Sequence, residues 1–382
     1  MSRTRIPAVF MRGGTCKGVF FHARDLPTGR AEQEAIFLEM IGSPDPYNRQ
    51  LDGMGGGISS VSKAVIIEKS KRPDADIDYT FAQLGVDNAI VEWGSTCGNL
   101  STCVGPFALE EGLIEATDGE ATVRVFITNT GKTYESRFPV KDGIALERGD
   151  FIIPGVPGGG AKVSLCFNFP GGGVTGNLLP TGHECDNVLV DGLGNIATSM
   201  VDATNAVSFV AAKDLGLDGT ESPDELEADK DLMARVDAIR RATGVKIGLA
   251  NRPEDVTVGN PKIAIVGRPK NFTAIDGTRY TAEDQDISIR IVNLGRINRA
   301  VTLTGAMCLG VATLIDGSIP NQLVRGGATI RIANPSGVLP VEAAVKRNDA
   351  GVWEADMAGV FSTQRRLMEG HILVTEASKA SS

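Results

Sequence analysis

The chain has 382 residues, which is too long for one ordinary hydrophobic core, so two domains are expected. A hydrophobic content of 42% and a charged content of 22% are typical of a globular protein, and 5% aromatics beside 46 glycines predict many tight turns. The net charge of -9 argues against nucleic acid or an anionic membrane as a partner, because phosphate binding needs a basic surface.

The N-terminus and the cysteines favour a cytoplasmic protein without a bound metal. The opening MSRTRIPAVFMRGG lacks the apolar core of a secretory signal, and no stretch approaches the roughly 20 apolar residues of a membrane span. No CxxC pair occurs and only three histidines are present, so no metal site is expected. The six cysteines are scattered, which indicates reduced thiols: Cys16, Cys97, Cys103, Cys166, Cys185 and Cys308.

Strand-like runs bounded by Gly, Pro or Asp dominate the chain. They predict strands at Pro7–Phe10, Gly18–His22, Ala64–Glu68, Ile77–Gln83, Thr122–Thr128, Lys162–Phe169 and Ile263–Val266. Helical spacing predicts helices over Ala31–Ile41 and Asp224–Thr243, with Gly244 at the expected stop of the second. The apolar face of this second helix carries Leu226, Leu232, Val236 and Ile239.

A weak internal repeat indicates two similar domains. IDYTFAQLG followed by TCGNLSTCVGPFALEEGLI resembles ISIRIVNLG followed by LTGAMCLGVATLIDGSI. Each copy predicts a strand, a polar turn and a small-residue helix that is buried on all sides, because it has almost no charged face. Two α+β domains are therefore expected, over residues 1–186 and 187–382, with a C-terminal tail that packs back on the first.

The first motif with chemical potential is MRGGTCKG, residues 11–18. Its exposed amides and the cations Arg12 and Lys17 could cradle a carboxylate, with Thr15 and Cys16 as further contacts. A tight turn between strands with solvated charges is an equal alternative. The spacing differs from that of a Walker A motif.

The second motif is DGMGGGISSVSKAVII, residues 52–67. Lys63 stands between a Gly/Ser loop and an apolar strand, so its amine is expected to be partly desolvated, which favours the neutral form that acts as a base. The loop would let a ligand approach the backbone, with Ser60 as a candidate contact. The alternative is a lysine that snorkels at a strand end.

The third motif, TCGNLSTCVGPFALEEG, is the strongest. Cys97 directly precedes the expected buried helix, so the free amides of Gly98 and Asn99 would point at a bound carboxylate. The same helix end lowers the pKa of the Cys97 thiol. Cys103 falls inside the helix and is interpreted as a core residue, and a buried, inert thiol is the alternative for Cys97 as well.

Further candidates lie in the second half of the chain. FPGGGVTGNLLPTG is another anion-friendly loop with Thr175 and Gly176, and LTGAMCLG places Thr304 and Gly305 at the start of the second buried helix. The ends of the two buried helices are expected to face each other. NPSG adds Ser336, and the arginines of QRRLMEG could equally be salt-bridged surface residues.

Together these motifs resemble those of the PrpF-like family. They occur in one order over nearly the whole chain: MRGGTCKGVFF, IGSPDPY, DGMGGGISSVSK, CGN with VGPFAL, PGGGVTGNLLPTG, TGAMCLG, NPSG and QRRLMEG. The resemblance implies the diaminopimelate epimerase-like α+β fold, with two pseudo-symmetric domains. Each would be a curved, mostly antiparallel sheet around a central helix.

The resemblance also implies an activity, which is cofactor-independent isomerisation of a small unsaturated tricarboxylate. Family members include 2-methylaconitate isomerase, 4-oxalomesaconate tautomerase, methylitaconate isomerase and aconitate isomerase, and the wording of the motifs is most like the first. A homodimer is the family's usual state.

The family's catalytic lysine and cysteine map to Lys63 as principal acid/base and Cys97 as its partner. The residues expected to bind carboxylates are Arg12, Thr15, Cys16, Lys17, Ser60, Gly98, Asn99, Thr175, Gly176, Thr304, Gly305 and Ser336. The turn commonly reads RGGTSKG in the family, whereas Cys16 stands here in place of the serine, which bears on substrate preference.

Three rival functions are weighed against this one. An amino-acid epimerase of the same fold would need a second cysteine before the second buried helix, where Thr302 stands. A non-catalytic accessory protein of an aconitase-like dehydratase would bind a partner but show no isomerase activity. An NAD enzyme is disfavoured because no GxGxxG lies between a strand and a helix.

Overall fold

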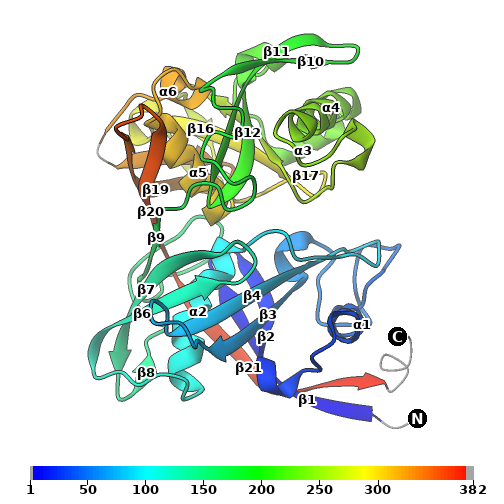
Figure 1. Cartoon of the computed structure of the whole chain (residues 1–382), viewed down its shortest axis with the longest axis vertical. Helices are drawn as coiled ribbons and strands as arrows, with labels where there is room; N and C mark the ends of the chain where they lie inside the picture. Colours follow the sequence, from blue (N-terminus) through cyan, green and yellow to red (C-terminus); the bar gives the residue numbers. More distant parts are fainter. Residues whose placement is uncertain (1–2, 328, 376–382) are drawn as a thin grey trace. The chain divides into compact units, whose positions relative to one another are not determined.

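The computed structural model describes residues 3–327 and 329–375, which form two compact units (Figure 1). Of the described residues, the first unit contains 3–152, 158–165 and 362–375, and the second contains 153–157, 166–327 and 329–361. The chain thus leaves the first unit well before residue 186, where the sequence analysis set the boundary. The turn around 180–186 belongs to the second unit, where Thr181 Oγ1 donates to Asp186 Oδ2 over 2.6 Å at the start of a strand.

The elements of the first unit follow each other in this order: β1 (Arg3–Gly13), β2 (Cys16–His22), α1 (Arg30–Ile41), β3 (Lys63–Lys69), β4 (Ile77–Leu84), β5 (Val91–Glu92), α2 (Gly98–Glu110), β6 (Gly119–Ile127), β7 (Lys132–Lys141), β8 (Ile144–Ala145) and, after the second unit, β21 (Gln364–Thr375). β9 (Val163–Asn168) lies where the chain passes from the first unit to the second. The expected strands of this half are all present, with ends that differ by a few residues.

The second unit contains β10 (Asp186–Val190), β11 (Gly194–Ala203), β12 (Asn205–Ala211), α3 (Pro223–Ala228), α4 (Lys230–Lys246), β13 (Lys262–Gly267), β14 (Phe272–Thr273), β15 (Arg279–Tyr280), β16 (Ile287–Asn293), β17 (Arg296–Ile297), α5 (Leu303–Thr313), α6 (Ile319–Leu323), β18 (Ile330–Asn334), β19 (Gly337–Arg347) and β20 (Trp353–Ser362).

The strand pairings of the two units follow the same scheme. In the first unit β1–β2, β3–β4 and β6–β7 pair antiparallel, whereas β2–β3 and β4–β6 pair parallel. In the second unit β11–β12, β13–β16 and β18–β19 pair antiparallel, whereas β12–β13 and β16–β18 pair parallel. The helices α2 and α5 follow corresponding strands, β5 and β17, so the internal repeat is a repeat of the whole topology.

The two repeat helices are buried along their length, as their composition predicts. Residues 98–109 of α2 and all residues of α5 are buried. Small residues allow this close packing, because a helix wrapped by strands has no face left for long polar side chains. Cys103 and Cys308 are fully buried inside these helices, and burial raises the pKa of both thiols, so they are inert core residues.

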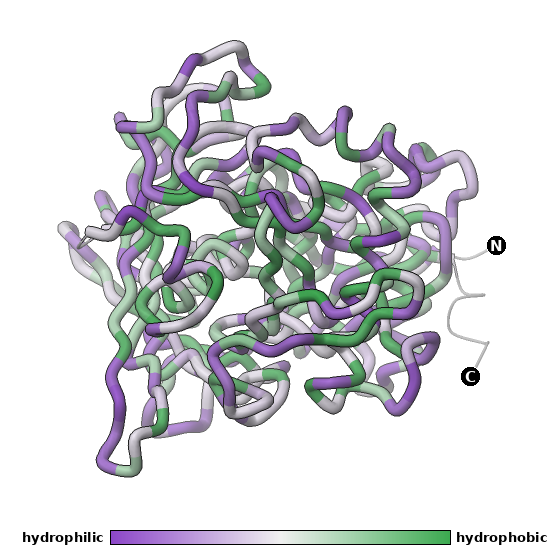
Figure 2. The backbone as a smooth tube through the Cα atoms, turned by 90° about the horizontal axis from the view of Figure 1, so that it is seen from above, coloured by the Kyte–Doolittle hydropathy of each residue, from purple (hydrophilic) through white to green (hydrophobic). Residues whose placement is uncertain are grey.

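Each sheet packs a second helical layer on its other face. In the first unit α1 contributes Ile36, Phe37, Met40 and Ile41 to a core that also contains strand residues of β1–β4 and β21. In the second unit α3 and α4 pack on β10–β13 in the same way. Figure 2 shows hydrophobic stretches within the fold and hydrophilic ones in its outer loops. Within the described ranges, none of the helices is long and apolar enough to cross a membrane.

The C-terminal strand completes the first sheet. β21 pairs antiparallel with β1 along nearly its whole length, from Arg3 opposite Thr375 to Gly13 opposite Gln364 (Figure 1). The end of the described chain therefore packs against the first unit, as the sequence analysis expected of the tail. Residues beyond 375 lie outside the described ranges.

The helix expected over Asp224–Thr243 is in fact two helices. Asp229 ends α3 and caps α4, because its side chain accepts a hydrogen bond from the amide of Leu232 over 2.9 Å. Gly244 does not end the helix but lies inside α4, which continues to Lys246. A Cβ at Gly244 would lie 2.6 Å from Val256 Cγ1, so close packing and not helix termination explains the glycine.

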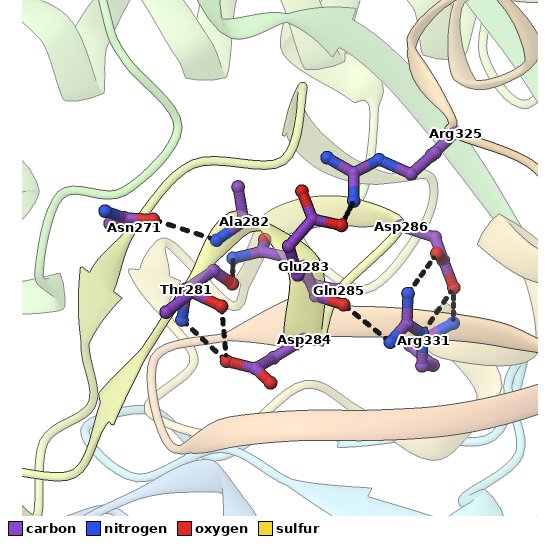
Figure 3. A network of polar contacts seen from close by, with 9 residues as sticks. All are labelled: Asn271, Thr281, Ala282, Glu283, Asp284, Gln285, Asp286, Arg325 and Arg331. Carbon is purple, nitrogen blue, oxygen red and sulfur yellow. Dashed lines mark hydrogen bonds and ion pairs between the residues drawn. The ribbon is translucent and has the colours of Figure 1, made fainter.

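A polar network ties an irregular segment of the second unit to its sheet (Figure 3). Arg331 on β18 forms a two-pronged ion pair with Asp286 at 2.7 and 3.0 Å. Arg325 pairs with Glu283 at 2.7 Å. Thr281 and Asp284 form a capping box on the short helical turn Ala282–Asp284. These contacts are all within the protein, so the network fixes the segment 281–286 against β18.

Replacement of Gly244 by Ala is expected to lower the free energy of unfolding by about 1 kcal/mol. The added methyl group meets Val256, and overpacking of this kind costs about 1–3 kcal/mol, against about 1 kcal/mol gained in helix propensity. Chemical denaturation measures the change, with Asp229→Ala as a reference that removes the N-cap of the same helix. An unchanged or higher stability of Gly244→Ala would contradict the packing explanation.

Candidate active site

Lys63 opens β3 and is buried, with 4% of its surface exposed. Its Nζ donates a hydrogen bond to Oε1 of Gln83, which lies directly opposite on β4. The same Nζ lies 5.0 Å from the centroid of the Phe81 ring. A neutral amide oxygen and an aromatic face therefore hold the amine.

Cys97 occupies the N-cap position of α2, and its backbone is held firmly. Its carbonyl oxygen accepts hydrogen bonds from the amide and hydroxyl of Ser101, at 2.9 and 3.0 Å, and from the hydroxyl of Tyr79 at 3.3 Å. The sulfur faces the backbone amides of Asn99 and Leu100 in the first turn, so the thiol lies at the positive end of the helix.

The thiols of Cys97 and Cys16 interact with each other, and their acidities separate. Burial raises the pKa of Cys97, but a hydrogen bond with Cys16 and the positive charge of Lys63 lower it. The amides of Asn99 and Leu100 act in the same direction, and the resulting pKa of Cys97 is about 6. The hydrogen bond to Cys97 and burial raise the pKa of Cys16 well above its ordinary value. At neutral pH the pair is therefore a Cys97 thiolate and a Cys16 thiol that donates to it.

Two glycines allow the turn between β1 and β2 to lie against the start of α2. A Cβ on Gly13 would lie 2.3 Å from the carbonyl oxygen of Asn99. Gly14 has a φ of +51°, and a Cβ there would lie 2.0 Å from Oδ1 of Asn99. The amide of Thr15 donates to the same Oδ1 over 3.2 Å. This contact brings Cys16, the next residue, to the helix N-terminus.

Arg12 holds this turn in place. Its Nη1 donates to the carbonyl of Gly14 at 3.1 Å and to the carbonyl and hydroxyl of Thr363 at 2.9 and 3.0 Å. The amide of Gly14 also donates to the Thr363 carbonyl over 2.9 Å. The guanidinium thus connects the β1–β2 turn to the chain just before β21.

We call Lys63, Cys16 and Cys97 the cysteine–lysine cluster. Lys17 and Ser60 are not part of this cluster. Lys17 follows Cys16 on β2, so its side chain leaves the opposite face of the strand, where Nζ lies 5.6 Å from the centroid of the Phe10 ring. Ser60 lies half-buried in the short turn Ser59–Val61 that precedes β3.

The Gly/Thr loop of the second unit already binds a carboxylate of the protein itself. The amides of Val174 and Thr175 donate to Oδ2 of Asp202 at 2.8 and 2.6 Å, and the Thr175 hydroxyl donates to it at 2.9 Å. Gly176 follows with a φ of +90°. The anion-binding character expected of this loop is real, but its anion is intramolecular.

The other second-unit candidates also have protein partners. Thr302 caps α5, and its Oγ1 accepts from the amide of Gly305 over 3.2 Å. The carbonyl of Thr304 accepts from the hydroxyl of Thr204 over 2.8 Å. Ser336 donates its hydroxyl to a backbone carbonyl over 2.8 Å. Because Thr302 holds the position of Cys97 in the repeat, α5 offers no thiol at its N-cap for a two-thiol mechanism.

Sequence reasoning missed Gln83, although it ended an expected strand. A polar residue at the end of an apolar run reads as a surface position, whereas Gln83 is buried beside Lys63. For the two arginines of QRRLMEG the sequence left a surface salt bridge open as an alternative. Arg366 does form salt bridges, with Glu110 at 3.2 Å and with Glu111 at 2.5 Å.

Two hollows of the first unit lie apart from the cysteine–lysine cluster. One of about 930 Å³ lies between α1 and β21 and is lined by residues such as Leu38, Tyr47 and Leu51. The other, of about 440 Å³, lies beside His22 and Glu111. Neither lining includes a residue of the cluster. Within the described ranges, no group of His, Cys, Asp or Glu side chains is arranged to hold a metal ion.

Comparison with known proteins places these features in one family. The model of the PrpF protein family matches residues 3–375. The chain is 38% identical to a 2-methyl-aconitate isomerase of Shewanella oneidensis over 97% of both chains, and 38% identical to a 3-methylitaconate isomerase of Eubacterium barkeri over 98% of both. It is 37% identical to a 4-oxalomesaconate tautomerase of Pseudomonas putida, covering 98% of this chain and 97% of that one.

Solved structures confirm the expected fold. The crystal structure of a methylitaconate-delta-isomerase matches with a TM-score of 0.80 and 37% identity, and covers 100% of this chain and 98% of that one. A probable proline racemase from Agrobacterium radiobacter matches with a TM-score of 0.56 and 17% identity, over 97% and 93%. The second likeness shows the fold alone, which is the two-fold repeated α+β architecture described above.

The acidity of Cys97 can be tested by its alkylation with iodoacetamide as a function of pH. Only the thiolate reacts, so the rate at Cys97 is expected to fall to half its plateau near pH 6, as measured by peptide mass spectrometry. Cys185 is an internal control. The residue is exposed, and the partial burial of its sulfur raises its pKa above the ordinary value. A midpoint for Cys97 as high as that of Cys185 would contradict the proposed environment.

Proposed function

The chain belongs to the PrpF family and is an isomerase, and we propose that Lys63 and Cys97 carry the protons that it moves within a small unsaturated polycarboxylate. The single observation that carries this proposal is the cysteine–lysine cluster. A buried amine and a thiol whose pKa is about 6 share one site at a helix N-terminus.

The electrostatics of the cluster favour Cys97 as the base that removes the proton and Lys63 as the acid that returns one. At neutral pH the Cys97 thiolate can remove a proton from the allylic carbon beside a substrate carboxylate, which leaves a dienolate. The ammonium of Lys63 then returns a proton at the far allylic carbon, or at the same carbon after rotation. Proton exchange between the resulting thiol and neutral amine restores the starting state.

The developing negative charge needs fixed dipoles nearby. In the first turn of α2 the amides of Asn99 and Leu100 face the sulfur of Cys97, and the Gly98 amide is the first of the same helix end. These donors are preorganised, because the turn at Gly13 and Gly14 holds Asn99 from the other side. We therefore assign Gly98 and Asn99 to the binding of a substrate carboxylate.

The preferred substrate is 2-methylaconitate, with methylitaconate, 4-oxalomesaconate and aconitate as alternatives. The sequences of the motifs support 2-methylaconitate. Relatives named for three different substrates are almost equally similar to the chain, at 37–38% identity. All four molecules have an acidic allylic position beside a carboxylate. The same two proton carriers would therefore serve any of them.

We also propose that the protein is a cytoplasmic homodimer that needs no cofactor. Cysteines without disulfides are in keeping with a reducing compartment, and all six are free. Size-exclusion chromatography with light scattering tests the dimer, and dialysis against a chelator tests the independence from metal.

Proton NMR in heavy water tests the proposed function directly. The wild-type protein is expected to isomerise one of the four substrates and to incorporate deuterium, whereas Lys63→Ala and Cys97→Ser should lose at least about 100-fold of both rates. Lys69→Ala is the matched control, because Lys69 is an exposed lysine at the other end of β3. Exchange that persists at the wild-type rate in Lys63→Ala would remove the assignment.

Cys16 can be examined with a pair of variants. Cys16→Ser keeps a hydrogen-bond donor beside the thiolate, so its rate is expected to stay within about threefold of wild type. Cys16→Ala removes the donor and should raise the alkylation midpoint of Cys97 by about one pH unit, because a hydrogen bond to the charged form favours that form. Equal midpoints in the two variants would show that the Cys16 thiol does not support the thiolate.

A further inference from the structure

We propose that Gln83 is the positioning residue of the active site: its amide oxygen fixes the amine of Lys63 beside Cys97 and, being neutral, leaves the charge of that amine to act on the thiolate. The inference rests on the proposed function, since it concerns the same proton carriers. Gln83 lies in neither the family motifs quoted above nor the set of residues expected from the sequence.

The orientation of the Gln83 amide is fixed by the backbone around it. Its Nε2 donates to the carbonyl oxygens of Ser59 and Ser62 at 3.0 Å each and to that of Leu84 at 3.2 Å. Three carbonyls on one side leave only one way to place the amide, because a flipped group would set oxygen against oxygen. The Oε1 atom must therefore face Lys63.

The register of the sheet delivers this oxygen to the amine. Lys63 and Gln83 are directly opposite on the antiparallel strands β3 and β4, so their side chains leave the same face. Phe81 lies two residues earlier on β4 and shares that face. The amine is thus confined between an aromatic ring and an amide oxygen.

The neutrality of the acceptor is the point that bears on chemistry. In the part of the chain that the structure describes, the polar partner of Lys63 is the amide of Gln83, and no carboxylate lies within ion-pair distance of its Nζ. A carboxylate in this place would form a tight pair with the ammonium and neutralise its field at the sulfur atoms. With Gln83, the charge of Lys63 favours the thiolate of Cys97.

The same amide connects the amine to the Gly/Ser turn before β3. The two carbonyls at Ser59 and Ser62 belong to the segment that also contains Ser60. Ser62 is itself held by Gln50, whose Oε1 accepts from the Ser62 hydroxyl at 2.8 Å and from the amide of Gly57 at 2.9 Å. Movement of this turn would therefore move Gln83, and with it the amine.

Two substitutions separate the acceptor role of Gln83 from its structural role. Gln83→Glu and Gln83→Met both remove the donors to the three carbonyls, so both carry the same structural loss. Only Gln83→Glu keeps an acceptor for Lys63, and this acceptor is charged. Gln33→Glu is the matched control, because Gln33 likewise accepts from a cation, Arg30, at 3.2 Å and donates to a carbonyl at 2.8 Å, but lies on the surface helix α1.

For Gln83→Glu, the midpoint of Cys97 alkylation against pH is expected to rise by about one unit or more, since a carboxylate claims the ammonium. The acidic limb of kcat/KM should move upward by the same amount. For Gln83→Met, kcat should fall at least about tenfold while KM changes less than about threefold, because the amine loses its anchor. Gln33→Glu should reproduce the wild-type midpoint and kcat.

The alkylation measurement needs no substrate, so it separates this inference from the proposed function. If no substrate is turned over by the wild-type protein, the proposed function fails and the alkylation midpoint still tests Gln83. A wild-type midpoint in Gln83→Glu, together with a lowered melting temperature alone in both Gln83 variants, would overturn the positioning role. If Gln83→Glu does not fold, an unchanged kcat in Gln83→Met overturns it in the same way.

Discussion

The positive end of a buried helix is the constraint on which the rest of the first unit depends. α2 has no polar face, so the strands wrap it completely, and its free amides must end in a buried place where water cannot satisfy them. A thiolate at Cys97 meets these amides, and the ammonium of Lys63 balances the thiolate. Each charge would be costly alone at such burial, and together with the helix end they stabilise one another. The site is thus a consequence of how the helix is packed.

The second unit shows what the same topology does without this chemistry. Its strands β12 and β13 open with Asn205 and Lys262, at the places where β2 and β3 open with Cys16 and Lys63. Its central helix starts with Thr302 in place of Cys97, and the threonine hydroxyl closes the helix end by accepting from a backbone amide. A neutral threonine hydroxyl accepts a hydrogen bond from a free amide of the helix end, whereas a cysteine at the same position lets these amides stabilise a thiolate. The repeat therefore conserves the scaffold and differs in the residue at the helix start.

Much of the fold could be predicted from the sequence, because its signals are local. The repeat, the small-residue helices and the strand at Lys63 are written in short windows, and these predictions are confirmed. The roles of Arg12 and of the Gly/Thr loop could not be predicted, since both depend on partners far along the chain, Thr363 and Asp202. Gly244 misled for the same reason: its meaning comes from the distant Val256. An anion-friendly loop has the same sequence whether its anion is a ligand or a side chain of the protein.

Under the proposed function, the balance of charge in the first unit limits how it would recognise a polycarboxylate. The thiolate of Cys97 and the ammonium of Lys63 cancel, Arg12 is engaged with the turn, and Lys17 leaves the opposite face of its strand. Such a cluster offers carboxylates few free side-chain cations, so under the proposed function recognition within this unit would come chiefly from backbone amides at the start of α2. Fixed amides distinguish carboxylates by position more than by number of charges. The proposed recognition by amides would suit relatives whose names carry different substrates, 2-methyl-aconitate, 3-methylitaconate and 4-oxalomesaconate.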